Sequence, residues 1–363
     1  MKVKPEIPNN NLPHLPPDRE AIETKVVLRQ VSKAAVALAE LKGMALTLPN
    51  QNILINAIVL KEAKASSEIE NIVTTQDSLY QALTAKAFKP DLATKEVLRY
   101  REALFAGADF IREKDFLSIN GILQIQNILE ENDAGLRKMP GTVLKNGTTG
   151  KVVYSPPDDK IIIEKLMANF EQYLNNTETD DISLLIKLAV LHFQFESIHP
   201  FYDGNGRTGR IINVLFLMLK GLLDNPILYL SGFIIRNKGE YYRLLGDVNL
   251  NNKWEPWILY ILNGIEETAL ETIAQIKNIN RLMVDTIAKV KEEAPSVYSK
   301  ELIELLFEHP YSKIEHLEYK GIAKRKTAGK YLTELARIGI LEPNKIGKEV
   351  IYINKLLYEL LKK

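Results

Sequence analysis

The stretch that decides the fold is HPFYDGNGRTGR, residues His199–Arg210. The segment before it, residues 180–198, has an acidic start and apolar residues at helical spacing, and the apolar pattern resumes after Arg207. The stretch is therefore predicted to be a loop between two core helices, the second beginning near Arg207. Backbone N–H groups at the start of that helix lack partners, and with the helix dipole they favour an anion.

The side chains of this loop are those that phosphate chemistry uses. The guanidinium groups of Arg207 and Arg210 are suited to bidentate phosphate binding. Asp203 offers one carboxylate to a cation such as Mg²⁺, which usually shares its coordination with waters and substrate phosphates. The imidazole of His199, with an ordinary pKa of about 6.5, is a candidate base for an incoming hydroxyl. The loop follows a helix and lacks the lysine of GxxxxGK[ST], which argues against a P-loop.

The composition excludes several classes of protein. The 363 residues are enough for two or three domains, and 47 basic against 46 acidic residues give no global preference for nucleic acid or membrane surfaces. The absence of cysteine excludes disulfides and cysteine-ligated metals. No apolar run approaches the roughly 18 residues of a membrane span, and the proline-rich first residues lack the apolar core of a secretory signal. We expect a cytoplasmic protein without a membrane partner.

Most of the remaining chain is predicted to be helical, with an extended proline-rich arm up to about Asp18. A β-hairpin is expected within Gly135–Asp159, from two short β-type runs, Thr142–Lys145 and Lys151–Tyr154, around a turn signal at Asn146–Gly147. Besides the two helices that flank the loop, helices are predicted over 19–44, 50–72, 91–111, 118–131, 160–174, 239–249 and 256–294.

The residues after Pro295 are predicted to form a separate domain. Their pattern indicates three helices followed by a hairpin, which is the order of a winged helix-turn-helix. The third helix, about 324–338, begins with three basic residues and is the one that would enter a DNA groove. From Ser296 onward there are 13 basic and 9 acidic residues, so the electrostatic signal for DNA is weak. DNA binding and a role in protein contact or homodimer formation therefore both stay open.

The loop matches every specified position of HPFx(D/E)GNGRxxR, the signature of the Fic family, and the resemblance extends over roughly 50–262. It implies a mainly α fold: a Fic-type helical bundle with a β-hairpin flap, plus the C-terminal winged helix-turn-helix domain. The expected regions are 1–110, with an inhibitory helix at about 51–71; 111–285, the catalytic core with the flap (135–159) and the motif loop (199–210); and 295–363.

The resemblance also implies an activity, the transfer of AMP from ATP to a Ser, Thr or Tyr hydroxyl of a target protein or of the protein itself, with release of pyrophosphate. His199 would act as the base, and Asp203 would hold Mg²⁺ as cofactor. The flap edge at Thr142, Val143 and Leu144 would dock the target. The expected ATP-binding residues are Gly204, Asn205, Gly206, Arg207, Thr208, Gly209, Arg210, Tyr241, Tyr242 and Asn249. From the sequence alone, helix packing is the more common role of aromatic residues at such spacing.

A second motif, SSEIEN, lies N-terminal to the loop on a predicted helix. It resembles the family's inhibitory pattern [ST]xxxE[GN], with Ser66, Glu70 and Asn71 at the specified positions. A carboxylate at Glu70 would pair with Arg210 and compete with the γ-phosphate, so Glu70 would also border the ATP site. The resemblance therefore predicts an enzyme that inhibits itself.

Three alternatives stay open. The same fold could remove AMP, with Glu70 positioning a water molecule, or transfer another phosphoryl-type group. A protein of another class, a DNA-binding regulator that senses nucleotide through this loop, would use the same residues without catalysis. His192, on the helix before the loop, is expected to be a packed core residue.

Overall fold

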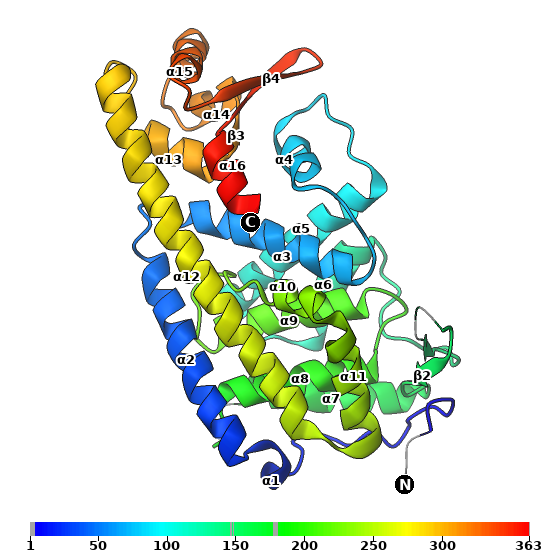
Figure 1. The fold of residues 1–363 in the computed structure, drawn as a ribbon. Coiled ribbons are helices and arrows are strands. Elements are labelled where there is room, and N and C mark those ends of the chain that lie inside the picture. The colour runs from blue at the N-terminus through cyan, green and yellow to red at the C-terminus, as the bar shows by residue number, and fades with distance from the viewer. Residues whose placement is uncertain (1–3, 146, 148, 177–180, 363) are drawn as a thin grey trace.

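The computed structural model describes residues 4–145, 147, 149–176 and 181–362, and most of them are helical (Figure 1). The N-terminal region contains α1 (Arg19–Ile22), α2 (Lys25–Ala45), α3 (Asn52–Ile69), α4 (Gln76–Thr84), α5 (Leu92–Lys114) and α6 (Ile119–Glu130). The single helix predicted over 19–44 is instead two, because Thr24 is extended and its hydroxyl caps α2 by accepting the Val27 N–H at 3.2 Å. The short α4 was not predicted.

The middle of the chain supplies the hairpin and the most buried helices. It contains β1 (Leu144–Lys145), β2 (Val152–Tyr154), α7 (Lys160–Asn175), α8 (Leu184–Ile198), α9 (Asn205–Leu219), α10 (Leu230–Arg236) and α11 (Lys238–Asn251). Almost every residue of α8 and α9 is buried, because other helices surround both. The loop between these two helices is therefore held on a rigid support.

The 40-residue helix α12 (Trp254–Glu293) joins the two ends of the molecule. At 1.5 Å per residue it is about 60 Å long. It packs along α2 for much of its length and continues to the C-terminal region (Figure 1). Its buried positions recur at helical spacing, as the sequence pattern predicts.

The C-terminal region contains α13 (Lys300–Glu308), β3 (Tyr311–Ser312), α14 (Ile314–Tyr319), α15 (Arg325–Arg337), β4 (Glu342–Ile346), β5 (Glu349–Ile353) and α16 (Lys355–Lys362). The predicted order of three helices and a hairpin is present. Two elements were not predicted: β3, which pairs with β5 to give the antiparallel order β3-β5-β4, and α16, which packs on α12. The basic residues at the start of α15 are exposed, and DNA binding by this helix stays a prediction.

Among the described helices, none is both long enough and apolar enough to cross a membrane.

Candidate functional site

The signature loop connects α8 to α9 through two residues with positive φ. His199 ends α8 in the left-handed region at φ 49°, and Gly204 precedes α9 at φ 77°. The Asn205 side chain stabilises the loop by accepting the Phe201 N–H and donating to the Phe201 carbonyl, both at 2.8 Å. Helix α9 begins at Asn205, two residues before the start predicted near Arg207. The two hydrogen bonds between Asn205 and Phe201 hold this earlier start in place.

His199 is partly buried, and its surroundings keep its imidazole neutral. Burial lowers its pKa to about 4, and the positive charge of Arg137 adds to this effect. Arg137 is itself fully buried; its Nε donates to the His199 carbonyl at 2.7 Å, and Nη2 donates to the Pro157 carbonyl at 2.7 Å. Arg137 thus connects the backbone of His199 to the end of the flap through hydrogen bonds to both. Sequence reasoning missed this role, although Arg137 lies inside the predicted flap.

Arg210 meets the N-terminal motif at the C-terminal end of α3. Its Nη2 donates to Glu70 Oε1 at 2.8 Å and to the Ser66 carbonyl at 2.9 Å, and its Nε donates to Ser66 Oγ at 2.8 Å. Burial alone would raise the pKa of Glu70, but the charge and hydrogen bond of Arg210 hold it below its usual value. Glu70 is therefore an anion, and the structure brings together the pair that the two motifs predicted.

The Glu70 carboxylate lies over the first turn of α9. A Cβ added at Gly206 would collide with Glu70 Oε1 and crowd Arg210 Nη1, so glycine is needed for this close approach. Asn71, the next residue, has φ 65° and lets the chain turn away after α3, and Lys238 Nζ lies 3.4 Å from its Oδ1. A carboxylate thus lies at the helix start where an anion is favoured.

Arg207 has different partners. Its Nη2 lies 2.8 Å from Glu130 Oε1 and its Nη1 lies 3.3 Å from Glu96 Oε2, which joins α9 to α6 and α5. A Cβ added at Gly204 would collide with Glu130 Oε1. This close approach and the positive φ are two reasons for glycine at this position. Neither glutamate was singled out from the sequence, because isolated acidic residues on amphipathic helices usually face solvent.

Glu196, on the last turn of α8, is another group that the sequence did not reveal. A Cβ at Gly209 would collide with its Oε1, which has no hydrogen-bond partner among the described residues. Burial raises the pKa of Glu196 to about 7, against the opposing charge of Arg210, while Glu70 raises it further. The adjacent Thr208 is fully buried, and its hydroxyl likewise lacks a partner in the described structure.

Asp203 is exposed, and its Oδ1 accepts the Gly204 N–H at 2.7 Å. Burial raises the pKa of Glu130 against the charge of Arg207, and the charge of Asp203 adds to the rise. No group of three or more His, Asp or Glu residues suited to a metal ion occurs in the described part of the chain. An exposed single carboxylate fits Mg²⁺ that takes its other ligands from water and phosphates.

The three residues predicted on α11 lie in different surroundings. Tyr241 is fully buried, and its hydroxyl lies 2.9 Å from Nε2 of His192, the core histidine expected from the sequence. Tyr242 is 48% exposed; desolvation of its hydroxyl raises its pKa, and the charge of Glu70 adds to this effect. Asn249 donates to Ser197 Oγ at 3.1 Å, and its carbonyl oxygen lacks a described partner.

The flap is a short antiparallel hairpin in which Leu144 pairs with Tyr154. Of the three predicted edge residues only Leu144 lies in β1; Thr142 and Val143 precede the strand, and Val143 is exposed. Residue 146 of the predicted turn lies outside the described residues. The Tyr154 hydroxyl donates to the Ser197 carbonyl at 3.0 Å, so β2 is fixed to α8 while β1 lies outward.

The fold and the site define a helical protein in which a histidine lies beside a helix start that holds a carboxylate. The "Fic/DOC family N-terminal" model matches residues 28–109 and the "Fic/DOC family" model matches 110–217, so together they span more than half of the chain. The model "Protein adenylyltransferase SoFic-like, C-terminal domain" matches 282–357. This chain belongs to the Fic/DOC family.

Similar proteins include "Protein adenylyltransferase fic-1" of Caenorhabditis elegans, 28% identical over 169 residues (46% of this chain, 30% of that protein). "Protein adenylyltransferase Fic" of Nematostella vectensis is 28% identical over 186 residues (50% and 40%). The matched regions cover well under two thirds of these relatives.

Two solved structures share the fold. A Fic family protein from Desulfovibrio desulfuricans has TM-score 0.61 and 20% identity, covering 94% of this chain and 98% of its own. Fic-1 from C. elegans has TM-score 0.53 and 22% identity, covering 70% and 74%.

Proposed function

We propose that this protein transfers AMP from ATP to a hydroxyl side chain of a target protein or of itself. The observation that carries the proposal is the start of α9, where the Glu70 carboxylate lies over Gly206 and pairs with Arg210, at the end of the loop that His199 begins. An anion already lies at a position that a phosphate would favour for the same physical reasons. The relatives named adenylyltransferases support this choice among phosphoryl-transfer reactions.

In this reaction the target hydroxyl oxygen forms a bond to the α-phosphorus, and the bond from that phosphorus to the bridging oxygen of the β-phosphate breaks. Pyrophosphate leaves, and the hydroxyl proton goes to His199. The imidazole is ready to accept it, since burial keeps its pKa at about 4 and hence the ring neutral. The negative charge of bound ATP would raise that pKa and strengthen the base. The N–H groups at the start of α9 would orient the phosphates.

Mg²⁺ fits this site through Asp203, whose exposed carboxylate has one oxygen left after accepting the Gly204 N–H. A bound Mg²⁺ would neutralise part of the phosphate charge. The chain's own contribution is to hold Asp203 fixed at the helix start and to keep Glu130 nearby engaged with Arg207.

We further propose that the enzyme is inhibited as it stands. Arg210 is 2% exposed and already has the Glu70 carboxylate and two Ser66 oxygens as acceptors, so a γ-phosphate must compete with them. Because these acceptors belong to α3, displacement of its C-terminal end would release Arg210. The outward edge of β1 would then receive the target segment as an added strand. A homodimer stays a prediction that no contact in this single chain tests.

Intact-mass analysis of Glu70→Gly with ATP and Mg²⁺ tests the activity. A gain of one AMP per modified site is expected in Glu70→Gly, a much smaller gain in the wild type, and none in Glu70→Gly combined with His199→Ala. ATP labelled at the α- or γ-phosphate separates the alternatives. Label from the γ-position on protein would indicate phosphate transfer, and removal of AMP from a modified protein by the wild type would indicate the reverse reaction. Absence of label in every variant would reject the proposal.

A further inference from the structure

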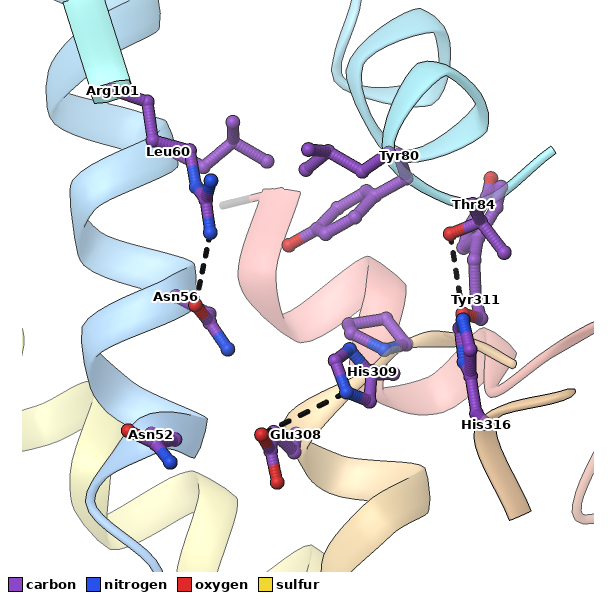
Figure 2. Close-up of a pocket in the computed structure, with 12 residues that line it drawn as sticks. Asn52, Asn56, Leu60, Tyr80, Thr84, Arg101, Glu308, His309, Tyr311 and His316 are labelled. Carbon is purple, nitrogen blue, oxygen red and sulfur yellow. Dashed lines mark hydrogen bonds and ion pairs between the residues drawn. The ribbon is translucent and has the colours of Figure 1, made fainter. Parts of the chain in front are cut away.

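A second cavity lies far from the signature loop, between the inhibitory helix α3 and the C-terminal region. Its volume is about 410 Å³; α3 and α5 bound it on one side, α4 lies opposite them, and α13, β3 and α14 close the remaining side (Figures 1 and 2). That volume falls within the roughly 300–1,000 Å³ of small-molecule pockets. No residue of this cavity belongs to the phosphate site described above.

Arg101, on the α3 side of the cavity, is a charged group with unfilled hydrogen-bonding capacity. Its Nη2 donates one long hydrogen bond, 3.3 Å, to Asn56 Oδ1, and its plane covers the Phe105 ring at 4.8 Å. Its Nε has no hydrogen-bond partner among the described residues. Partial burial lowers the pKa of this guanidinium, and the charge of Glu102, the next residue in the chain, opposes that effect. A half-buried cation with unfilled hydrogen-bonding capacity favours an anionic ligand.

Tyr80 adds a neutral donor from the opposite wall. Its ring is buried, and Figure 2 shows its hydroxyl directed across the cavity toward the side that carries Arg101 and Asn56. The hydroxyl makes no hydrogen bond of ordinary geometry with a described residue, although the nearby Gln76 amide opposes the rise in its pKa that burial causes. A buried hydroxyl of this kind usually has a partner.

The C-terminal wall carries two histidines and one carboxylate, Glu308. The rings of His309 and His316 lie 4.8 Å apart, and Nδ1 of His316 has no described partner. Burial lowers the pKa of both, that of His316 to about 4, and the charge of Arg101 helps to lower that of His309. The carboxylate on this wall, Glu308, is already paired with Lys320 at 3.1 Å. Glu308 Oε1 also lies 3.7 Å from His309 Nε2 (Figure 2), so the group that this wall leaves without a described partner is the neutral ring nitrogen Nδ1 of His316.

We propose that this cavity binds a small organic anion, with its phosphate or carboxylate group between Arg101 and Tyr80 and its apolar part against Leu60. The ligand would join the C-terminal region to α3, because Asn56 and Leu60 lie on α3 less than four turns before Glu70. A ligand that binds only when this cavity is formed stabilises the docked position of α3. Occupancy therefore holds Glu70 on Arg210, a consequence that rests on the proposed function.

Calorimetric titration with phenyl phosphate tests the site, with phenol as the neutral probe. We expect saturable binding of phenyl phosphate to the wild type and none of phenol. Arg101→Gln should weaken binding about tenfold or more, because a charge-assisted contact is lost while the amide can still reach Asn56. Tyr80→Phe, which removes one oxygen, should weaken binding several-fold, and Arg29→Gln, an exposed arginine on α2, should not change it.

Phenyl phosphate that still binds to Arg101→Gln would be bound elsewhere, as at the start of α9. Equal affinity of that variant and the wild type would therefore overturn the proposed cavity site. The absence of saturable binding to the wild type would overturn it as well. Hydrogen exchange tests the coupling without any assay of AMP transfer. When phenyl phosphate is added to the wild type, the backbone amides of residues 52–69 should exchange their hydrogens with solvent more slowly. In Arg101→Gln, the same addition should leave their exchange rates unchanged. Unchanged exchange in the bound wild type would overturn the coupling. A bound, protected α3 in a protein without transferase activity would contradict the proposed function alone.

Discussion

Two arginines three residues apart on α9 meet carboxylates in different ways. Arg207 pairs with Glu130 and Glu96, which belong to core helices α6 and α5, and the Glu130 side chain is only 12% exposed. Arg210 pairs with Glu70, which is 35% exposed and lies just beyond the end of α3. The first arrangement cannot open without disturbing the core, whereas the second can open by movement of one helix end. The same chemistry thus supplies a fixed support and, under the proposed function, a removable inhibitor.

The largest expected effect concerns the support. Arg207→Gln should reduce the free energy of unfolding by about 3 kcal/mol, because it removes the buried cation that the partly buried carboxylates of Glu130 and Glu96 share. Urea unfolding measures the change. Arg243→Gln is the matched control, since Arg243 is 55% exposed beside Glu240 and Asp247, and such pairs contribute less than about 1 kcal/mol. Similar losses in both variants would mean that Arg207 does not support the core.

The next effect concerns the inhibitor. Glu70→Gly should increase AMP transfer by about 10- to 100-fold, the equivalent of a charge-assisted contact of about 1.5–3 kcal/mol. Its effect on urea unfolding should be much smaller than that of Arg207→Gln, because Arg210 keeps both Ser66 oxygens. Glu68→Gly is the control on the same helix, where Glu68 pairs with Lys64 at 3.3 Å. An equal increase in that variant would show that a loosened helix, and not the lost carboxylate, activates the enzyme.

The third prediction concerns the pH dependence of stability that Glu196 causes, in contrast to the carboxylates paired with Arg207 and Arg210. Its folded pKa of about 7 lies above its ordinary 4.5, so between these values the folded protein binds more protons than the unfolded one. Its contribution to stability is therefore greatest at low pH and declines as the pH rises to about 7, by at most about 1.4 kcal/mol per pH unit. Relative to Glu196→Gln, the wild type should lose stability from pH 5 to pH 7.5 in urea unfolding. Parallel pH curves for the two proteins would contradict this assignment.

The sequence predicted the local parts of this site better than the distant ones. The loop, its flanking helices and the Glu70–Arg210 pair follow from two motifs whose residues are few and specific. The partners of Arg207 and the role of Arg137 do not follow, because their meaning depends on which helix faces lie together in the fold. The break at Thr24 and strand β3 also escaped prediction, since one capping hydroxyl and a two-residue strand leave little periodicity to detect. The cavity beside α3 arises between regions more than 200 residues apart in the chain.

The smallest expected effect sharpens the description of the inhibitor. Ser66→Ala removes the oxygen that accepts the Arg210 Nε proton and leaves the Ser66 carbonyl in place. Losing one such hydrogen bond weakens the inhibited arrangement by about 1 kcal/mol, so AMP transfer should increase about fivefold. Ser67→Ala is the matched control, because Ser67 is also buried but its hydroxyl has no described partner.

In the Glu70→Gly background the Ser66→Ala change should have little further effect, since the two residues hold the same guanidinium and their contributions are coupled. Rate measurements on the four proteins of this cycle give the coupling energy. Independent, multiplying effects would show that Ser66 acts elsewhere, and inhibition would then depend on the Glu70 carboxylate alone.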